Sequence, residues 1–171
     1  MFPKDLSAFI RIAEVLGIDA SFLRAVIDIN EGQKKGFIER IRKQLWNLKG
    51  KTLGILGLSF KPETDDMRFA PSIGIIQALA AEGAHLRLFD PQAMPEAKKI
   101  FHGGVTFVKN AYEAARGADA LVILTEWPEF LELDLKRIKK LLRHSVLFDG
   151  RNLYERARME KLGFQYVGVG R

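Results

Sequence analysis

The segment from Gly57 to Arg68, with the sequence GLSFKPETDDMR, holds the side chains of this chain that are best suited to chemistry. It contains an aromatic residue, a lysine, two adjacent aspartates and an arginine. An arginine can bind phosphate oxygens through two parallel N–H groups, and a lysine supplies a mobile positive charge. This combination indicates a loop that holds an anionic ligand.

The elements on either side of this segment predict where it lies. The apolar run before it, from Thr52 to Leu58, is typical of a buried parallel strand, and residues 70–81 are typical of a helix. The segment is therefore the first strand-to-helix connection of an α/β unit. In open parallel sheets, ligands bind at such connections, outside the carboxyl ends of the strands.

The rest of the chain divides near residue 49. Residues 1–48 read as two helices, the second starting near Asp19 and weakened in its middle by Gly32 and Gly36. Two helices cannot bury their apolar faces alone, so we expect this segment to form a homodimer with a partner subunit. Trp46 is expected to dock the second helix on the following domain.

Residues 49–171 alternate between strand and helix patterns, which predicts one Rossmann-like domain. The expected fold is a mostly parallel sheet of about six strands with helices on both faces. Expected strands cover residues 53–58, 85–89, 105–108, 120–125, 146–148 and 164–169, and expected helices cover 71–81, 95–100, 111–116, 135–142 and 154–162.

The usual dinucleotide-binding glycine motif is incomplete. Gly54 and Gly57 have the spacing of its last two glycines, but Thr52 stands in place of the first. The following helix cannot begin at once, so the tight turn that brings a pyrophosphate to a helix N-terminus is missing. Asp90 occupies the position of the acid that binds a ribose hydroxyl, and it could equally cap a turn ahead of Pro91.

Composition excludes several classes of protein. The 171 residues carry a net charge of +6, but the basic residues are mixed with acidic ones, which disfavours nucleic acid as a partner. No window is apolar enough to cross a membrane and the N-terminus is no signal peptide, so a cytoplasmic protein is expected. The absence of cysteine and the wide spacing of His85, His102 and His144 argue against a metal site.

Several segments together resemble one enzyme family. Residues 57–68, the sequence TEWPEF at 125–130 and the sequence FDGRN at 148–152 are similar to the C-terminal domain of the UDP-glucose/GDP-mannose dehydrogenases. The sequences FPKD at 2–5 and INE at 29–31 are similar to the central helical region of that family. The resemblance covers the whole chain in family order and favours the UDP-glucose branch.

The resemblance implies oxidation of the C6 alcohol of UDP-glucose to a carboxylate, with NAD as hydride acceptor. Met1 stands where the family has its cysteine nucleophile, and NAD would be bound mainly by a domain that this chain lacks. We therefore expect a fragment that is inactive alone. The alternatives are a non-catalytic nucleotide-binding or dimerisation module, or part of a GDP-mannose or UDP-N-acetylmannosamine dehydrogenase.

The resemblance also assigns roles to single residues. Phe60, Lys61 and Arg151 would bind the nucleotide sugar, and Lys4 and Arg68 would contact NAD. Asp5 would be the catalytic aspartate beside the missing thiolate.

Structural alternatives to these roles stay open. Lys61 could be a solvated surface residue, Phe60 could be a core residue closing the strand, and Asp5 could be only a first-turn acid favoured by the helix dipole. Arg68 could pair with Asp65 or Asp66, and Arg151 with Asp149. Phe69 replaces the acidic residue that usually follows the family's NAD-contacting arginine.

Overall fold

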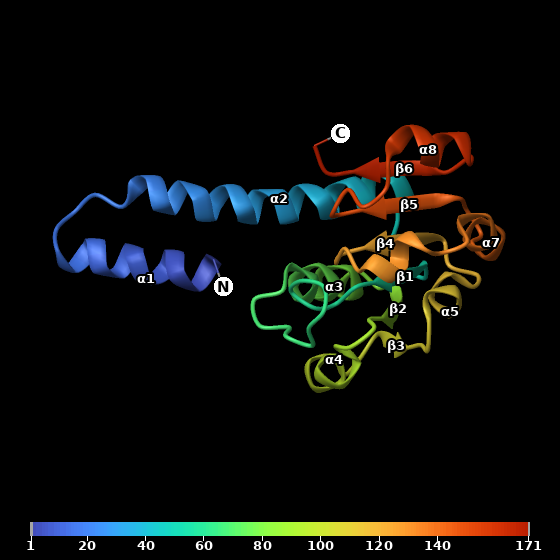
Figure 1. The fold of residues 1–171 in the computed structure, drawn as a ribbon, viewed down its shortest axis with the longest axis horizontal. Coiled ribbons are helices and arrows are strands. Elements are labelled where there is room, and N and C mark those ends of the chain that lie inside the picture. The colour runs from blue at the N-terminus through green and yellow to red at the C-terminus, as the bar shows by residue number, and fades with distance from the viewer. Residues whose placement is uncertain (1, 171) are drawn as a thin grey trace.

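The computed structural model describes residues 2–170, and the side chains of residues 5–170. A helical hairpin leads into a domain in which strands and helices alternate (Figure 1). The elements are α1 (Phe2–Val15), α2 (Ser21–Leu45), β1 (Thr52–Leu56), α3 (Pro71–Ala81), β2 (His85–Phe89), α4 (Met94–Ile100), β3 (Val105–Phe107), α5 (Ala111–Ala115), β4 (Ala120–Ile123), α6 (Pro128–Leu131), α7 (Leu135–Leu141), β5 (Val146–Asp149), α8 (Arg156–Lys161) and β6 (Gln165–Gly168).

The six strands form one sheet in the order β3-β2-β1-β4-β5-β6, and every neighbouring pair is parallel. The predicted Rossmann-like fold is therefore confirmed. The strand order reverses between β1 and β4: the chain continues from β1 to β2 and β3 on one side of this point, and from β4 to β5 and β6 on the other. A crevice at this switch point is the usual ligand position in such folds.

Helices cover both faces of the sheet, as the sequence predicts. Successive residues of a strand point to opposite faces, and in β4 Leu121 joins one buried cluster while Val122 joins the other. The cluster that contains Val122 packs against α2, α3 and α4. The cluster that contains Leu121 packs against α5, α6, α7 and α8.

Helix α2 is continuous over 25 residues, in spite of its two glycines. Its C-terminal half buries Phe37, Ile38, Ile41 and Leu45 in the same cluster as the sheet, and this packing outweighs the low helix propensity of glycine. Arg42 anchors it further, because its Nε lies 2.8 and 2.9 Å from the two carboxylate oxygens of Glu82.

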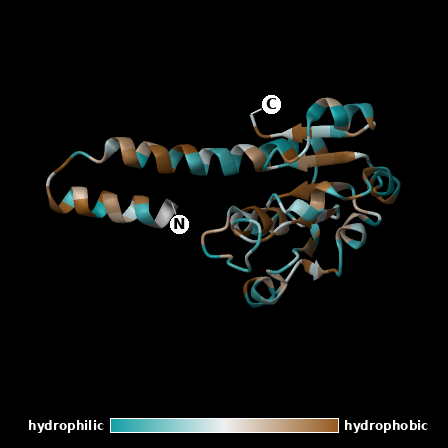
Figure 2. Cartoon of the chain, viewed as in Figure 1, coloured by the Kyte–Doolittle hydropathy of each residue, from teal (hydrophilic) through white to brown (hydrophobic). Residues whose placement is uncertain are grey.

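The N-terminal half of α2 and all of α1 extend away from the sheet as a hairpin (Figure 1). Apolar residues alternate with polar ones along this hairpin, which lies outside the sheet domain (Figure 2). The division into residues 1–48 and 49–171 stays a prediction, although the C-terminal half of α2 packs into the core of the second part.

The expected docking role of Trp46 is wrong. Its side chain is 94% exposed, and its backbone has a left-handed φ of +64° directly after α2. Helix α2 ends just before this residue, and the neighbouring Leu45 and Leu48 enter the core instead.

Four strands end earlier than the apolar pattern predicts, β3 and β6 by one residue and β1 and β4 by two. β1 ends at Leu56 and β4 at Ile123, yet Leu58, Leu124 and Thr125 beyond them are buried. The apolar pattern continues because these loops are buried under the neighbouring helices. Within residues 2–170, no helix combines the length and the apolar character needed to cross a bilayer.

Candidate functional site

The loop between β1 and α3 is fixed by the buried carboxylate of Asp90. This carboxylate follows β2, is 1% exposed and accepts five N–H hydrogen bonds from three parts of the chain. The donors are the backbone of Leu58 (2.6 Å), Ser59 (3.0 Å), Gln92 (2.9 Å) and Ala93 (2.8 Å), and the indole Nε1 of Trp127 (3.2 Å).

These contacts decide between the two interpretations of Asp90. Both of its oxygens are already used within the protein, and the side chain is closed off from solvent. Asp90 therefore fixes the turn before α4 and the start of the β1–α3 loop, and it is not available to bind a ribose. The domain has the Rossmann arrangement of strands, but it lacks the glycine turn and the free acidic residue that usually bind a dinucleotide.

Further hydrogen bonds hold the loop against its neighbours. The Thr125 hydroxyl donates to the carbonyl of Ser59 at 2.6 Å, and the Ser72 hydroxyl donates to the carbonyl of Leu58 at 2.5 Å. Within the loop, the backbone N–H of Phe60 donates to the carbonyl of Asp66 at 2.8 Å. The loop is thus a fixed support for the side chains that it presents.

A hollow of about 380 Å³ lies between α2, the β1–α3 loop and the loop after β5. Phe60 and Arg151 both line it, so the structure brings together two of the three side chains expected to bind a nucleotide sugar. Phe60 is half-buried at the wall of this hollow and is not a core residue. Phe37, Phe69 and Leu6 add apolar surface.

Carboxylates hold both the backbone and the guanidinium of Arg151. Its backbone N–H donates to the buried carboxylate of Asp149 at 3.0 Å. Its guanidinium makes a two-point ion pair with Glu126, through Nε and through Nη2 at 2.8 Å from Oε1. The expected alternative of an ion pair with Asp149 is therefore wrong, since Asp149 receives the backbone and Glu126 receives the side chain.

Lys61 and Arg68 lie on the same loop as Phe60, but both side chains are exposed. Arg68 pairs with Asp66, as one of the two structural alternatives predicts: Nε lies 3.0 Å from Oδ1 and Nη2 lies 2.8 Å from Oδ2. These hydrogen bonds lower the pKa of Asp66 to about 2. The pair borders a second hollow, lined also by Thr64 and Glu96, so Arg68 and Arg151 do not meet in one site.

The two candidates on α1 are only partly placed. Asp5 is exposed in the first turn of the helix, next to Leu6, which lines the hollow of Phe60 and Arg151. The side chain of Lys4 lies outside the part of the chain whose side chains the structure describes.

Sequence reasoning missed two charged residues at this site. Lys34 of α2 lines the hollow and pairs with Glu31 at 2.5 Å, although its basic run resembles an ordinary solvated helix face. Glu126 lies inside the quoted sequence TEWPEF, yet no spacing rule connects it to Arg151, which is 25 residues away. Among the described residues, no group of His, Asp and Glu side chains could hold a metal ion.

Comparison with known proteins agrees with this geometry. Residues 54–156 match the model of the UDP-glucose/GDP-mannose dehydrogenase family, UDP binding domain. The chain is 40% identical over 170 residues to UDP-glucose 6-dehydrogenase TuaD of Bacillus subtilis (strain 168), and the match covers 99% of the chain and 37% of that protein. It is 43% identical over 180 residues to UDP-glucose 6-dehydrogenase of Pseudomonas aeruginosa, covering 99% of the chain and 39% of that protein.

A solved structure shows the same arrangement. The UDP-glucose dehydrogenase of the hyperthermophilic archaeon Pyrobaculum islandicum superimposes with a TM-score of 0.85 at 33% identity, over 98% of this chain and 36% of that one. The chain thus spans less than two fifths of the length of the relatives named here. The family match covers most of the chain, and the parallel sheet and the β1–α3 loop without a dinucleotide-binding glycine turn agree with it. This chain therefore belongs to the UDP-glucose/GDP-mannose dehydrogenase family.

Proposed function

We propose that this chain supplies the nucleotide-sugar-binding part of an NAD-dependent UDP-glucose 6-dehydrogenase. The observation that carries the proposal is the meeting of Phe60 and Arg151 at one hollow, at the carboxyl ends of β1 and β5. An aromatic wall and a fixed guanidinium suit a ligand that has both a flat or apolar part and phosphate oxygens. The named relatives at 40% and 43% identity favour UDP-glucose over the other sugars of the family.

Each side chain would have a separate task in binding. Arg151 would hold the diphosphate, because a guanidinium binds oxyanions through paired N–H groups. Lys61, exposed on the loop, would close over the ligand and add positive charge. Phe60 would contact the apolar faces of the ligand and exclude water from it.

NAD would be held mainly by parts of the protein outside these 171 residues. Asp90 supports this view. Both of its carboxylate oxygens accept hydrogen bonds within the protein and the residue is buried, so it cannot bind the ribose of a dinucleotide. Arg68 suits a contact with an anionic cofactor, because its side chain is 83% exposed at the rim of the second hollow. NAD, when bound, would accept the hydride, while Asp5 would move a proton near the sugar and Lys4 would lie against the cofactor.

The proposal is tested by measuring binding of UDP and UDP-glucose to the chain by isothermal titration calorimetry. We expect both to bind, and we expect Arg151→Gln to weaken binding of UDP by about tenfold or more, because a charged hydrogen bond to phosphate is lost. Arg143→Gln is the matched control. Arg143 is also ion-paired, to Asp119 at 3.5 Å. It precedes β5 and so lies at the amino ends of the strands, whereas Arg151 lies at their carboxyl ends.

Two results would count against the proposal. Absence of binding by any uridine nucleotide at millimolar concentration would remove the enzyme assignment. Tighter binding of GDP-mannose than of UDP-glucose would move the chain to another branch of the family.

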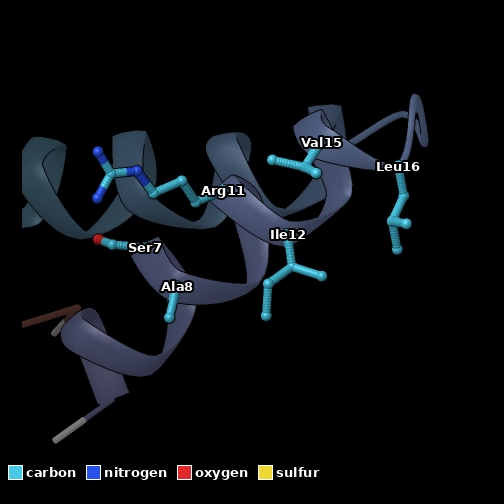
Figure 3. Close-up of a pocket in the computed structure, with 6 residues that line it drawn as sticks. All are labelled: Ser7, Ala8, Arg11, Ile12, Val15 and Leu16. Carbon is cyan, nitrogen blue, oxygen red and sulfur yellow. The ribbon is translucent and has the colours of Figure 1, made fainter.

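We also propose that the chain forms a homodimer through its N-terminal helices. Phe9, Ile12 and Val15 on α1, and Leu16 directly after it, are between 55% and 83% exposed. Figure 3 shows the side chains of Ala8, Ile12 and Leu16 pointing away from α2. A row of exposed apolar side chains on a helix is typical of a protein–protein interface.

Sedimentation velocity tests the dimer. We expect the unmodified chain to sediment as a dimer and Ile12→Glu to sediment as a monomer, because a charge at the centre of an apolar interface is costly to bury. Gln92→Glu adds the same charge at an exposed position of the sheet domain and should remain dimeric. A monomeric unmodified chain, or a dimeric Ile12→Glu variant, would contradict the proposed interface.

A further inference from the structure

We propose that Glu126 is a positioning residue, which holds the Arg151 guanidinium in the orientation that receives a diphosphate. This inference rests on the proposed function, because it assigns a role to a neighbour of the proposed substrate-binding arginine. Glu126 itself is not among the residues that line the hollow, whereas Arg151 is. It would therefore act on a ligand through Arg151.

The contact between the two side chains is a two-point ion pair. Nε and Nη2 of Arg151 donate to the two different oxygens of Glu126. Such fork-to-fork pairing fixes the plane of the guanidinium as well as its distance. The side chains are 35% and 36% exposed, so water screens the pair only in part.

Both partners are attached to buried anchors. Glu126 stands between Thr125, which bonds to the carbonyl of Ser59, and Trp127, which bonds to Asp90. The backbone of Arg151 is bonded to Asp149, a fully buried carboxylate that also accepts from the Tyr154 backbone and the Tyr166 hydroxyl. The ion pair therefore joins two rigid loops across the end of the sheet.

The pair leaves donors for a ligand. A guanidinium has five N–H groups, and Glu126 takes two of them, one on Nε and one on Nη2. The remaining N–H groups, on Nη1 and Nη2, lie on the outer edge of the guanidinium and can bind two phosphate oxygens. Arg151 can thus bridge Glu126 and a diphosphate at the same time.

Glu126 stays ionised over the whole neutral range. Partial burial alone would raise its pKa, but the hydrogen bonds that it accepts and the charge of Arg151 together lower it below the ordinary value. The carboxylate is therefore present whenever a nucleotide sugar arrives. Without it, the long arginine side chain would sample several rotamers and would have to be ordered on binding.

A double-mutant cycle on the binding of UDP tests this role. We expect Glu126→Gln to weaken UDP binding about fivefold, measured by calorimetry on the full chain, because glutamine keeps the shape but loses the charge and one acceptor. Combined with Arg151→Gln, the Glu126→Gln substitution should add almost nothing further, since it acts only through that arginine. A merely structural role would make the two effects additive.

Glu132→Gln is the matched control, because it removes the same charge from an exposed residue six positions further along the chain. It should bind UDP as the unmodified chain does, and all variants should keep its circular dichroism spectrum. UDP binding by Glu126→Gln that equals or exceeds that of the unmodified chain would overturn the inference, and so would additive effects in the cycle. Failure of the unmodified chain to bind UDP would instead overturn the proposed function, so the two failures are distinguishable.

Discussion

Replacing Asp90 with asparagine is expected to destabilise the protein by about 3 to 5 kcal/mol, since each buried donor that loses its acceptor costs about 1 to 3 kcal/mol and at least two donors are affected. The carboxylate accepts five N–H hydrogen bonds, and asparagine offers only one oxygen. Whichever way the amide is turned, its NH₂ group would face at least two N–H donors. Buried donors would be left without acceptors at the start of the β1–α3 loop or at the turn before α4.

Urea unfolding monitored by tryptophan fluorescence measures this effect. The chain has two tryptophans, and Trp46 is 94% exposed whereas Trp127 is 4% exposed and bonded to Asp90. In a Trp46→Phe background, the emission reports on Trp127 alone, so loss of its hydrogen bond is visible beside the shift in unfolding midpoint. We expect UDP binding to weaken as well, because the loop that carries Phe60 loses its anchor.

Asp134→Asn is the matched control for Asp90. Asp134 caps α7 by accepting from the backbone N–H of Arg137 at 3.0 Å, and its side chain is exposed. Asparagine caps a helix as well as aspartate does, so the free energy of unfolding should change by only a few tenths of a kcal/mol. A similar small change for Asp90→Asn would show that the network around Asp90 contributes little to stability.

The role of Asp90 could not be predicted from the sequence. An aspartate after the second strand, ahead of a proline, suits both a ribose-binding acid and a turn-forming acid. The residue type is the same in both cases, and only the positions of the donors decide. Those donors come from residues 58–59, 92–93 and 127, which are brought together by the sheet.

The fold itself could be predicted, because it depends on repeating patterns. Short apolar runs alternating with helical ones have few solutions other than a parallel sheet with helices on both faces. The error at Trp46 has a local cause. A large aromatic residue at the end of an amphipathic helix is usually buried, but the left-handed turn at this residue sends Leu45 and Leu48 inward instead.

The site could be predicted in part for the same reason. Phe60 and Arg151 each follow a strand, and parallel strands bring their carboxyl ends to one edge, so their meeting follows from the topology. Glu126 and Lys34 could not be found in this way. Their positions depend on side-chain geometry and on the path of α2 over the sheet, which no periodicity in the sequence encodes.

Replacing Gly57 with alanine is the second change from which we expect a large effect, about 3 kcal/mol or more of lost stability. Gly57 has a φ of +83°, where a side chain is strained by about 1 kcal/mol. A Cβ there would also lie 2.6 Å from the backbone nitrogen and from Cβ of Thr125. The Thr125 hydroxyl also donates to the carbonyl of Ser59, so moving Thr125 away from the β1–α3 loop to make room for the Cβ would break this hydrogen bond.

Gly117→Ala separates the two causes. Gly117 also has a positive φ, of +64°, but a Cβ there would meet nothing within 4 Å. We expect this control to lose only about 1 kcal/mol, the cost of the backbone strain alone. The difference between the two variants in the free energy of unfolding, measured in urea, then gives the cost of crowding between the β1–α3 loop and Thr125 in the loop after β4. Equal losses would mean that the two loops can move apart without cost, and the fixed support assigned to Phe60 would no longer hold.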